Sequence, residues 1–471
     1  MKKTIFFLLF IVCASEITAQ LRLPAVIGDH MVLQQQSDAP LWGWASPSEE
    51  LTVTGSWGDK IEVKTKATNT GSWKLSLKTP VAGGPYTITI KGKDQFIIND
   101  VMIGEVWICS GQSNMEWSVN NGALDAKAEM PNADIPAIRL FNVNKSGAND
   151  PQVHGEGEWR LCTPETMKGF SSVGYFFGKK LNADLKAPIG LINVSWGGTP
   201  AEVWTPEAKV KNDAALKKSA DVLVQKDGWP KDPGVVYNAM IRPLVPYQIA
   251  GAIWYQGESN TAAPQTYSQL MKAMIESWRS DFQKEFPFYY VQIAPYTYGL
   301  KFQGALIREQ QVKTLSVPKT GMIIISDNVP DVKNIHPPNK KPVGDRLANY
   351  ALGENYKQAI PKSAYQSPVF QSMKIEKNKI RVSFMFGDNG LINRGITNQI
   401  TIAGDDKKFY PAIAVVDGNT LVVSAKEVKV PVAVRFCFDN ASIPNLYNKE
   451  GLPVSAFRTD SWEVEMTPEN Q

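Results

Sequence analysis

Three histidines occur in this chain, and each could act as a general base, because histidine titrates near neutral pH. His30 lies in a strand-rich region, and His154 lies in a connection rich in glycine and aspartate. His336 follows a predicted strand at residues 322–326, and catalytic groups of α/β sheets lie in loops after strand ends. His336 is therefore the candidate base, and a plain surface histidine is the alternative.

A serine stands in a similar place after the predicted strand at residues 106–110, in the segment GQSNM at residues 111–115. Gly111 allows a tight turn that would hold the Ser113 hydroxyl clear of the sheet, and the serine N–H could help bind an oxyanion. The segment is not a GxSxG elbow, because Met115 replaces the second glycine. Taken alone, it is also compatible with an ordinary polar turn.

Two further strand ends carry groups of the same kind. The predicted strand at residues 189–195 runs into a glycine pair that ends at Gly198, where a backbone N–H could approach a ligand closely. The predicted strand at residues 249–255 runs into Gln256 and Glu258. Gln256 could donate to an oxyanion, and Glu258 could either order the site or cap a helix. Together with Ser113 and His336, these groups indicate an acyl-transfer site built from strand-end loops.

The elements that position these groups alternate between strand and helix. Strands are predicted at residues 106–110, 137–143, 189–195, 249–255, 288–293 and 322–326, and helices at 172–185, 267–282, 307–315 and 344–356. In the first helix, Val173, Phe177, Leu181 and Leu185 are four residues apart and lie on one face. This alternation predicts an α/β domain with a parallel sheet that is covered on both faces.

The two flanks of this region have β patterns. Short strands are predicted at residues 51–55, 61–66, 73–77 and 86–91, which is typical of a small β-sandwich. Further strands are predicted at residues 380–384, 400–403, 413–416, 420–423 and 433–438. We therefore divide the chain into residues 1–19, a β domain at 20–103, an α/β domain at 104–362, and a β-rich region at 363–471 that packs on it.

Residues 1–19 have the pattern of a secretory signal peptide. Lys2 and Lys3 precede an apolar run at residues 4–14, and Ala19 offers a small-residue cleavage site. A membrane anchor is the alternative, but the run is short for a bilayer, and no later segment has 18 uninterrupted apolar residues. We expect export to the periplasm or the extracellular space, with no stable membrane insertion after cleavage.

Composition excludes several classes of function. The chain has 471 residues, 43% of them hydrophobic, and a formal net charge of +4, which argues against wholesale disorder and gives no reason to expect a nucleic-acid partner. Removal of Cys13 with the signal would leave Cys109, Cys162 and Cys437, so a Cys109–Cys162 bond is possible. No cysteine or histidine spacing suggests a zinc site, and we expect neither metal nor organic cofactor.

The motifs resemble those of the sialate O-acetylesterases, which belong to the SGNH-type hydrolases. The resemblance rests on GQSNM at 111–115, SWGGT at 195–199, WYQGESN at 254–260, IHP at 335–337 and NLYNKEGLP at 445–453. It implies a three-layer α/β/α domain, Ser113 as nucleophile and His336 as base. It also implies an oxyanion hole of the Ser113 and Gly198 N–H groups and the Gln256 side chain, with Asn114 and Glu258 in support.

One position departs from the SGNH pattern. Many members carry an aspartate three residues before the catalytic histidine, and this chain has Lys333 there. Asp331 and Asp327 are the nearby carboxylates. We expect a Ser-His dyad oriented by a backbone carbonyl, and rank Asp331 second as a third catalytic member.

The resemblance implies hydrolysis of acetyl esters on sialic acid hydroxyls. Acetylated xylan or another polysaccharide is the first alternative substrate, and a non-catalytic carbohydrate-binding protein is the second. A lipid ester is disfavoured because no long apolar lid segment occurs. Four aromatic residues near the motifs could stack on sugar rings, with core packing as the alternative: Trp117, Trp196, Trp254 and Tyr255. Arg308 and Arg346 lie in the same domain and are candidates to bind a sugar carboxylate.

Overall fold

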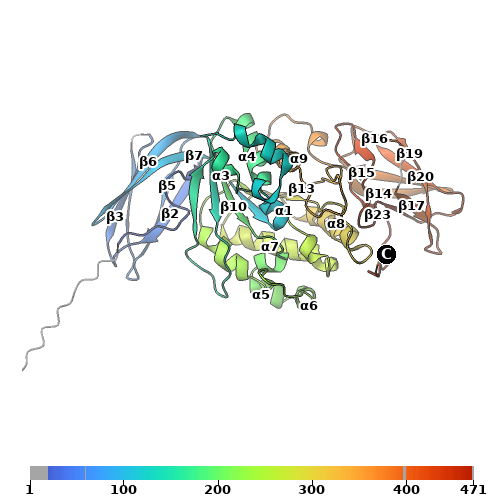
Figure 1. Ribbon diagram of the computed structural model, residues 1–471, viewed down its shortest axis with the longest axis horizontal. Coiled ribbons are helices and arrows are strands. Elements are labelled where there is room, and N and C mark those ends of the chain that lie inside the picture. The colour runs from blue at the N-terminus through green and yellow to red at the C-terminus, as the bar shows by residue number, and fades with distance from the viewer. Residues whose placement is uncertain (1–19, 59, 396–398, 469–471) are drawn as a thin grey trace, which may run out of the picture.

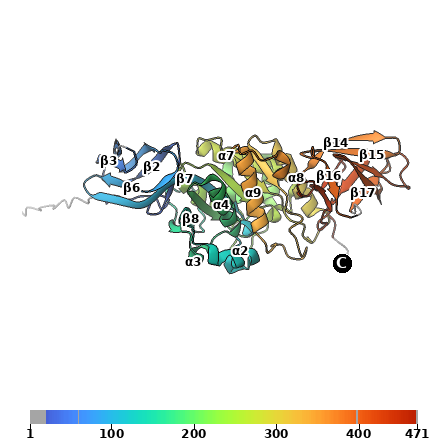
Figure 2. The same ribbon diagram turned by 90° about the horizontal axis from the view of Figure 1, so that it is seen from above.

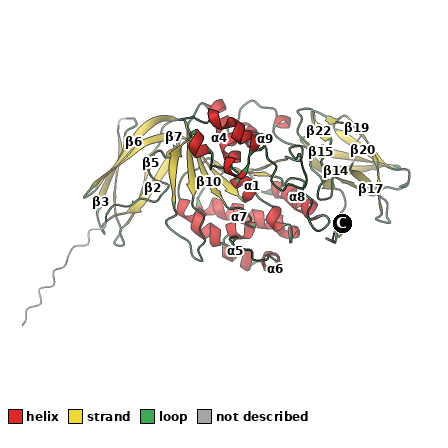
Figure 3. Cartoon of the chain, viewed as in Figure 1, coloured by secondary structure: helices red, strands yellow, loops and turns green. Residues whose placement is uncertain are grey.

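The computed structural model describes residues 20–58, 60–395 and 399–468, so the predicted signal peptide lies outside the described residues. Figure 1 shows three parts in a row along the longest axis, with a β region at each end of a central part. The helices gather in that central part, between two regions built of strands (Figure 3). Among the described residues, no helix is long and apolar enough to cross a membrane.

The central part is built on one sheet, with the strand order β13-β12-β11-β7-β10-β8-β9. Its strands are β7 (Gln95–Gly111), β8 (Ile138–Val143), β9 (Gly157–Leu161), β10 (Ile189–Ser195), β11 (Gly251–Tyr255), β12 (Phe288–Val291) and β13 (Thr320–Ile323). Pairing is parallel from β13 to β8, which confirms the predicted α/β fold class. The edge strand β9 is antiparallel and was not predicted, because Trp159 is its one buried side chain and no apolar run marks it.

Helices cover both faces of this sheet. Side chains of β7 alternate between the faces, so Trp107 and Cys109 join one apolar cluster while Val106 and Ile108 join another. In Figure 1, α4 (Ser172–Leu185) and α9 (Lys341–Glu354) lie on one side, and α7 (Tyr267–Asp281) lies on the other. The remaining helices are α1 (Ser113–Glu116), α2 (Leu124–Glu129), α3 (Pro164–Met167), α5 (Glu207–Lys211), α6 (Ala214–Asp221) and α8 (Gln303–Lys313).

Helix α4 has the bounds that its spacing predicts. Its N-cap, Ser171, accepts a hydrogen bond from the N–H of Gly174 at 3.0 Å and donates to the carbonyl of Met115 at 2.6 Å. Helix α9 packs closely against α4 at Gly344, which has no side chain: a Cβ there would lie 2.8 Å from the backbone nitrogen of Phe177. The cap therefore ties α4 to the short helix α1, which carries the candidate nucleophile.

The N-terminal β region continues directly into the central sheet. Its strands are β1 (Val32–Gln34), β2 (Asp38–Trp44), β3 (Glu50–Gly55), β4 (Ile61–Lys66), β5 (Ser72–Lys78) and β6 (Gly83–Lys91). Strands β2 and β5 pair with each other, while β3, β4, β6 and the start of β7 form the other sheet. The long strand β7 crosses residue 103, and one apolar cluster runs from Leu41 through to Trp254. The strand that leads to Ser113 is thus anchored in both parts.

The C-terminal region is antiparallel throughout. Its strands are β14 (Val369–Glu376), β15 (Lys379–Met385), β16 (Leu391–Asn393), β17 (Ile400–Ala403), β18 (Phe409–Pro411), β19 (Ile413–Asp417), β20 (Thr420–Ser424), β21 (Ala433–Phe436), β22 (Leu446–Asn448) and β23 (Phe457–Arg458). Arg458 pairs with Glu309 of α8 at 3.0 Å, and Gln292 donates to Ser455 at 3.0 Å. Seen from above in Figure 2, this region lies next to α8.

The three described cysteines are free and buried. The Cys109–Cys162 bond that the sequence left open is therefore not formed. Cys109 lies inside β7, and the Cys162 thiol donates to the carbonyl of Ala133 at 3.3 Å. Burial raises the pKa of Cys162 to about 12, so both groups serve as packing residues rather than nucleophiles.

Candidate active site

Ser113 stands where three strand ends meet. Strand β7 ends at Gly111, which pairs with Ser195 of β10 on one side and with Tyr255 of β11 on the other. Gly111 has φ +137°, and a Cβ there would lie 2.2 Å from the carbonyl oxygen of Tyr255. Only glycine fits this turn, and the turn places Ser113 as the first residue of α1 at the carboxyl edge of the sheet.

His336 is the histidine that reaches this serine. Its Nε2 lies 2.9 Å from the Ser113 hydroxyl oxygen, so the hydroxyl can donate its hydrogen to the imidazole. The ring stacks on Trp117 with 3.9 Å between centroids. The backbone N–H of His336 donates to the side-chain oxygen of Asn334 at 2.9 Å. Burial, aided by the Lys340 cation, lowers the pKa of His336 to about 4. The imidazole is thus neutral at neutral pH and can accept a proton.

The other two histidines lie elsewhere. Nδ1 of His30 lies 2.6 Å from the Asp100 carboxylate, which also pairs with Arg139 of β8. The His154 ring meets the edge of Trp44 at 6.3 Å between centroids. Both belong to contacts at the N-terminal β region, so the sequence preference for His336 agrees with the geometry.

The structure does not bring Asp331 to the imidazole. Asp331 is exposed, and its carboxylate accepts a hydrogen bond from the Lys333 N–H at 2.8 Å. Asp327 forms a bidentate pair with Arg346, with contacts of 2.7 and 2.6 Å. Within the described part of the chain, no carboxylate is hydrogen-bonded to His336. No hydrogen bond from the ring to a backbone carbonyl is found among these residues either, so the expected orientation by a carbonyl is not observed, and the ring instead stacks on Trp117.

Two backbone N–H groups beside the serine are free to bind an oxyanion. In the described residues, neither the Ser113 N–H nor the Gly198 N–H has a hydrogen-bond acceptor within the protein. Glu116, one turn after Ser113, accepts a hydrogen bond from the Gly197 N–H at 2.6 Å and so holds this turn. Gly198 has φ +77°, and a Cβ there would lie 2.1 Å from the Trp229 ring. This position therefore also requires glycine.

The structure gives Gln256 a place that does not suit an oxyanion donor. The side chain is fully buried, and its two amide hydrogens are donated to Asn260 Oδ1 at 2.8 Å and to the Thr199 carbonyl at 3.2 Å. Its own carbonyl oxygen accepts from the Tyr267 hydroxyl at 2.7 Å. Gln256 does follow the end of β11, as predicted, but its side chain points into the protein interior. No amide hydrogen remains for a substrate.

A buried polar network supports the nucleophile from below. The Asn114 amide donates to Glu258 Oε1 at 2.7 Å and to the Ile335 carbonyl at 3.0 Å, and its oxygen accepts from Lys340 Nζ at 2.7 Å. Lys340 is fully buried, which lowers its pKa to about 7 while Glu258 opposes the shift. Burial raises the pKa of Glu258. Sequence reasoning missed Lys340, because nothing distinguishes it from the lysine that follows.

A cleft of about 890 Å³ opens over Ser113 and His336. Its wall includes Trp196, the Gly197–Gly198 turn and the segment 222–231. Of the aromatic candidates from the sequence, Trp196 lines the cleft and Trp117 holds the imidazole, whereas Trp254 and Tyr255 are core residues. Trp229 was missed, because it lies in a loop far from any predicted strand end.

The two arginine candidates do not face the cleft. Arg308 is buried and donates to main-chain carbonyls of the C-terminal region, at 3.3 Å for Asn440, while Arg346 pairs with Asp327. Neither of these two candidates therefore lines the cleft in which a sugar carboxylate would bind. In the described ranges, no group of three or more histidine, cysteine, aspartate or glutamate side chains is arranged to hold a metal ion.

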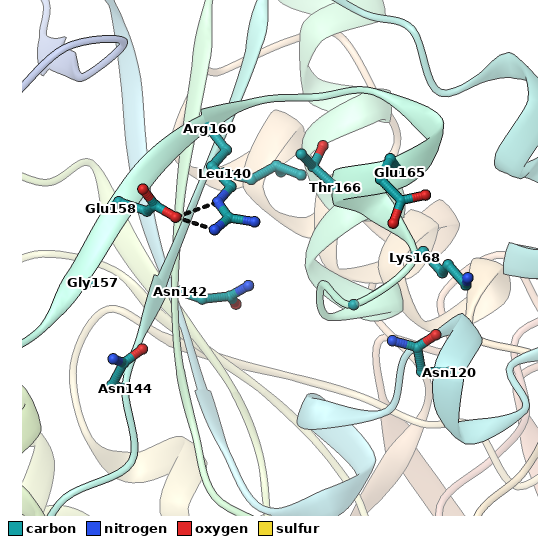
Figure 4. Close-up of a pocket in the computed structure, with 11 residues that line it drawn as sticks. Asn120, Leu140, Asn142, Asn144, Gly157, Glu158, Arg160, Glu165, Thr166 and Lys168 are labelled. Carbon is teal, nitrogen blue, oxygen red and sulfur yellow. Dashed lines mark hydrogen bonds and ion pairs between the residues drawn. The ribbon is translucent and has the colours of Figure 1, made fainter.

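A second, polar pocket lies apart from this chemistry (Figure 4). It has a volume of about 580 Å³ and is lined by hydrogen-bonding side chains of β8, β9 and α3, including the Glu158–Arg160 ion pair. None of Ser113, Gly198 and His336 lines it. The reactive groups belong to the cleft alone.

The fold and the site together define the class of an α/β/α hydrolase, whose polar groups gather in loops at the carboxyl edge of a parallel sheet. Residues 103–353 match the family described as "Carbohydrate esterase, sialic acid-specific acetylesterase", and this match covers more than half of the chain. The chain belongs to this family. The resemblance that the sequence motifs carry is thereby confirmed, and so is the prediction of an esterase.

Known relatives agree with this assignment. The sialate O-acetylesterase of Pongo abelii is 29% identical, and that of Homo sapiens is 28% identical; each alignment covers 83% of this chain and 79% of the relative. The crystal structure of a carbohydrate acetylesterase from Xanthomonas citri superposes with a TM-score of 0.85 at 36% identity. That comparison covers 94% of this chain and all of the other, so the flanking β regions are shared as well.

Proposed function

We propose that this carbohydrate esterase hydrolyses O-acetyl esters of sialic acids through an acetyl-enzyme on Ser113. The observation that carries the proposal is the 2.9 Å contact between the Ser113 hydroxyl and His336 Nε2, beside two unbonded backbone N–H groups. The names of the mammalian relatives support sialic acid as the sugar. The chemistry needs no metal and no organic cofactor.

In the first half-reaction, the Ser113 oxygen attacks the acetyl carbonyl carbon while His336 accepts the hydroxyl proton. The negative charge that develops on the carbonyl oxygen is stabilised by the N–H groups of Ser113 and Gly198. The bond between the sugar oxygen and the acetyl carbon then breaks, and His336 gives its proton to the sugar oxygen. The free sugar leaves, and the acetyl group stays on Ser113.

In the second half-reaction, His336 takes a proton from water, and the water oxygen attacks the acetyl carbon. The tetrahedral intermediate uses the same two N–H groups. When it collapses, His336 returns its proton to Ser113 and acetate leaves. A neutral imidazole is needed at the start of both halves, and its lowered pKa supplies this form at neutral pH.

An acetylated polysaccharide such as xylan is the second candidate substrate. The Xanthomonas citri relative is described only as a carbohydrate acetylesterase, so its name leaves the sugar open. The reactive groups would be the same, because they contact the acetyl group rather than the sugar.

We also propose that the enzyme is exported and acts in the periplasm or outside the cell, since residues 1–19 have the pattern of a signal peptide. Cell fractionation and N-terminal sequencing of the natively expressed protein test this point. A cytoplasmic protein that retains residues 1–19 would overturn it.

Acetate release from O-acetylated sialic acid and from acetylated xylan tests the substrate, with Ser113→Ala as the control. We expect release from sialic acid, and a loss of at least ~10³-fold in the variant. Release mainly from xylan would overturn the substrate and keep the site. Full activity of Ser113→Ala would overturn the mechanism.

A further inference from the structure

The segment 222–231 forms one wall of the catalytic cleft, and nothing in the proposed mechanism uses it. Within it, the Trp229 N–H donates to the Lys226 carbonyl at 3.1 Å, and Gly228 has φ +75°, so residues 226–229 form a tight turn. The Gln225 side chain donates to the carbonyls of Lys226 and Trp229 at 2.9 and 3.0 Å. These bonds hold the two ends of the turn together.

Apolar side chains of this wall are exposed to the cleft. Trp229 is 42% exposed, Val222 is 50% exposed and Val224 is 77% exposed. A group of exposed apolar side chains in a polar setting is typical of a binding surface. An indole ring suits the apolar face of a sugar ring, because stacking removes both surfaces from water.

Trp229 is also placed directly beside the reacting groups. Its ring packs against Gly198, where a Cβ would lie 2.1 Å from the indole. Gly198 carries one of the N–H groups that would bind the oxyanion. A sugar stacked on Trp229 would therefore present a substituent to Ser113.

Lys226 supplies a positive charge at the same place. Its Nζ lies 5.2 Å from the centre of the Trp229 ring. The two other lysines that line the cleft are paired with carboxylates: Lys145 with Glu116 at 2.6 Å, and Lys231 with Asp232 at 3.2 Å. Among the cleft-lining residues that the structure describes, Lys226 is the lysine that has no carboxylate partner. Its ammonium group is available to an anionic ligand.

We propose that Trp229 and Lys226 form the subsite that selects acidic sugars: Trp229 stacks on the ring, and Lys226 pairs with the sugar carboxylate. This inference rests on the proposed function, and it names the residues that would distinguish sialic acid from the neutral sugars of xylan. A carboxylate on the ring is the feature that a neutral sugar lacks, and a charge-assisted hydrogen bond to Lys226 would recognise it.

The test compares two substrates that differ at this carboxyl group alone: O-acetylated N-acetylneuraminic acid, in which it is charged, and its methyl ester, in which it is neutral. The readout is kcat/KM for acetate release. We expect the wild type to prefer the free acid, and Lys226→Gln to lower the ratio of acid to ester by about tenfold. Lys217→Gln, on α6 outside the cleft and paired with Asp221, is the matched control and should leave the ratio unchanged.

Trp229 is tested with the same two substrates. Trp229→Ala should raise KM for both alike, because stacking does not depend on the carboxylate, and Trp229→Phe should restore most of the affinity. An alanine variant with unchanged KM on both sugars would overturn the stacking role.

The outcomes separate this inference from the proposed function. Equal efficiency of the wild type on acid and ester, or a Lys226→Gln variant that keeps the wild-type ratio, overturns the subsite and leaves the sialic acid esterase standing. A wild type that releases acetate from xylan but from neither sialic acid substrate overturns both.

Discussion

The side-chain amide of Asn114 donates a hydrogen bond to the main-chain carbonyl of Ile335, with 3.0 Å between nitrogen and oxygen. Asn114 directly follows the nucleophile Ser113, and Ile335 directly precedes His336. One hydrogen bond thus joins the helix that carries the nucleophile to the loop that carries the base. Among the residues that the structure describes, no carboxylate is hydrogen-bonded to the imidazole, so this bond and the Trp117 stack help to hold the two reacting groups at their distance.

Asn114→Ala should therefore lower kcat by ~10²-fold, because a misplacement of about 1 Å between reacting groups has an effect of this size. KM should change little, since Asn114 is buried beneath the cleft. Steady-state kinetics with a thermal unfolding curve check this. Asn144→Ala, at an exposed asparagine, is the control. A kcat near that of the wild type would show that the His336 loop holds its own position.

The buried Gln256 side chain leads to a different expectation from that of an oxyanion donor. Gln256→Ala should lower the melting temperature, because it leaves the buried Thr199 carbonyl without its donor, at a cost of about 1–3 kcal/mol. The Tyr267 hydroxyl and Asn260 Oδ1 each lose one of two hydrogen bonds. The kcat of the folded enzyme should fall much less than the ~10²–10³-fold typical of a lost oxyanion donor. A loss of that size at an unchanged melting temperature would restore Gln256 to the oxyanion hole.

Much of the fold could be predicted because its signals are local. Helix α4 follows from apolar residues four positions apart, and the strands of the parallel sheet follow from short apolar runs. Strand β9 could not be found in this way, because only Trp159 is buried in it. Its place at the sheet edge depends on pairing with β8, which is a tertiary contact.

The candidate site could likewise be predicted where it depends on backbone position, but not where it depends on tertiary contacts. The strand-end rule found Ser113, Gly198 and His336, because backbone position alone brings such residues to one edge. It could not tell that Gln256 turns inward, since side-chain direction depends on Tyr267 and Asn260. For the same reason it missed Lys340, Glu116 and Trp229, whose partners come from distant segments.

Glu116 should act as a positioning residue for the oxyanion hole, because it accepts the Gly197 N–H bond at 2.6 Å. Glu116→Ala should lower kcat about tenfold with little change in KM, whereas Glu116→Gln should keep most of the activity through its amide oxygen. Lys145→Met removes only the partner of the other carboxylate oxygen and serves as the control. If the glutamine variant were as impaired as the alanine variant, the charge of Glu116 rather than this bond would be responsible.

The lowered pKa of His336 predicts the acid limb of the pH profile. Because the base must be neutral, kcat/KM should rise with pH through about 4 and then stay level, as the imidazole loses its proton. The Lys340 cation contributes to this shift, since a nearby positive charge disfavours a protonated imidazole. Lys340→Met removes that charge, so the pKa of His336 should rise and the acid limb should move to higher pH.

Rates measured from about pH 3.5 to about pH 8 test this shift. Lys341→Met is the matched control, because Lys341 is the next residue but is exposed and pairs with Asp345 of α9. Any inflection near pH 7 that disappears in Lys340→Met would belong to Lys340 itself, whose pKa burial lowers to about 7. An acid limb that stays in place, or moves to lower pH, would show that Lys340 does not act on the imidazole through its charge.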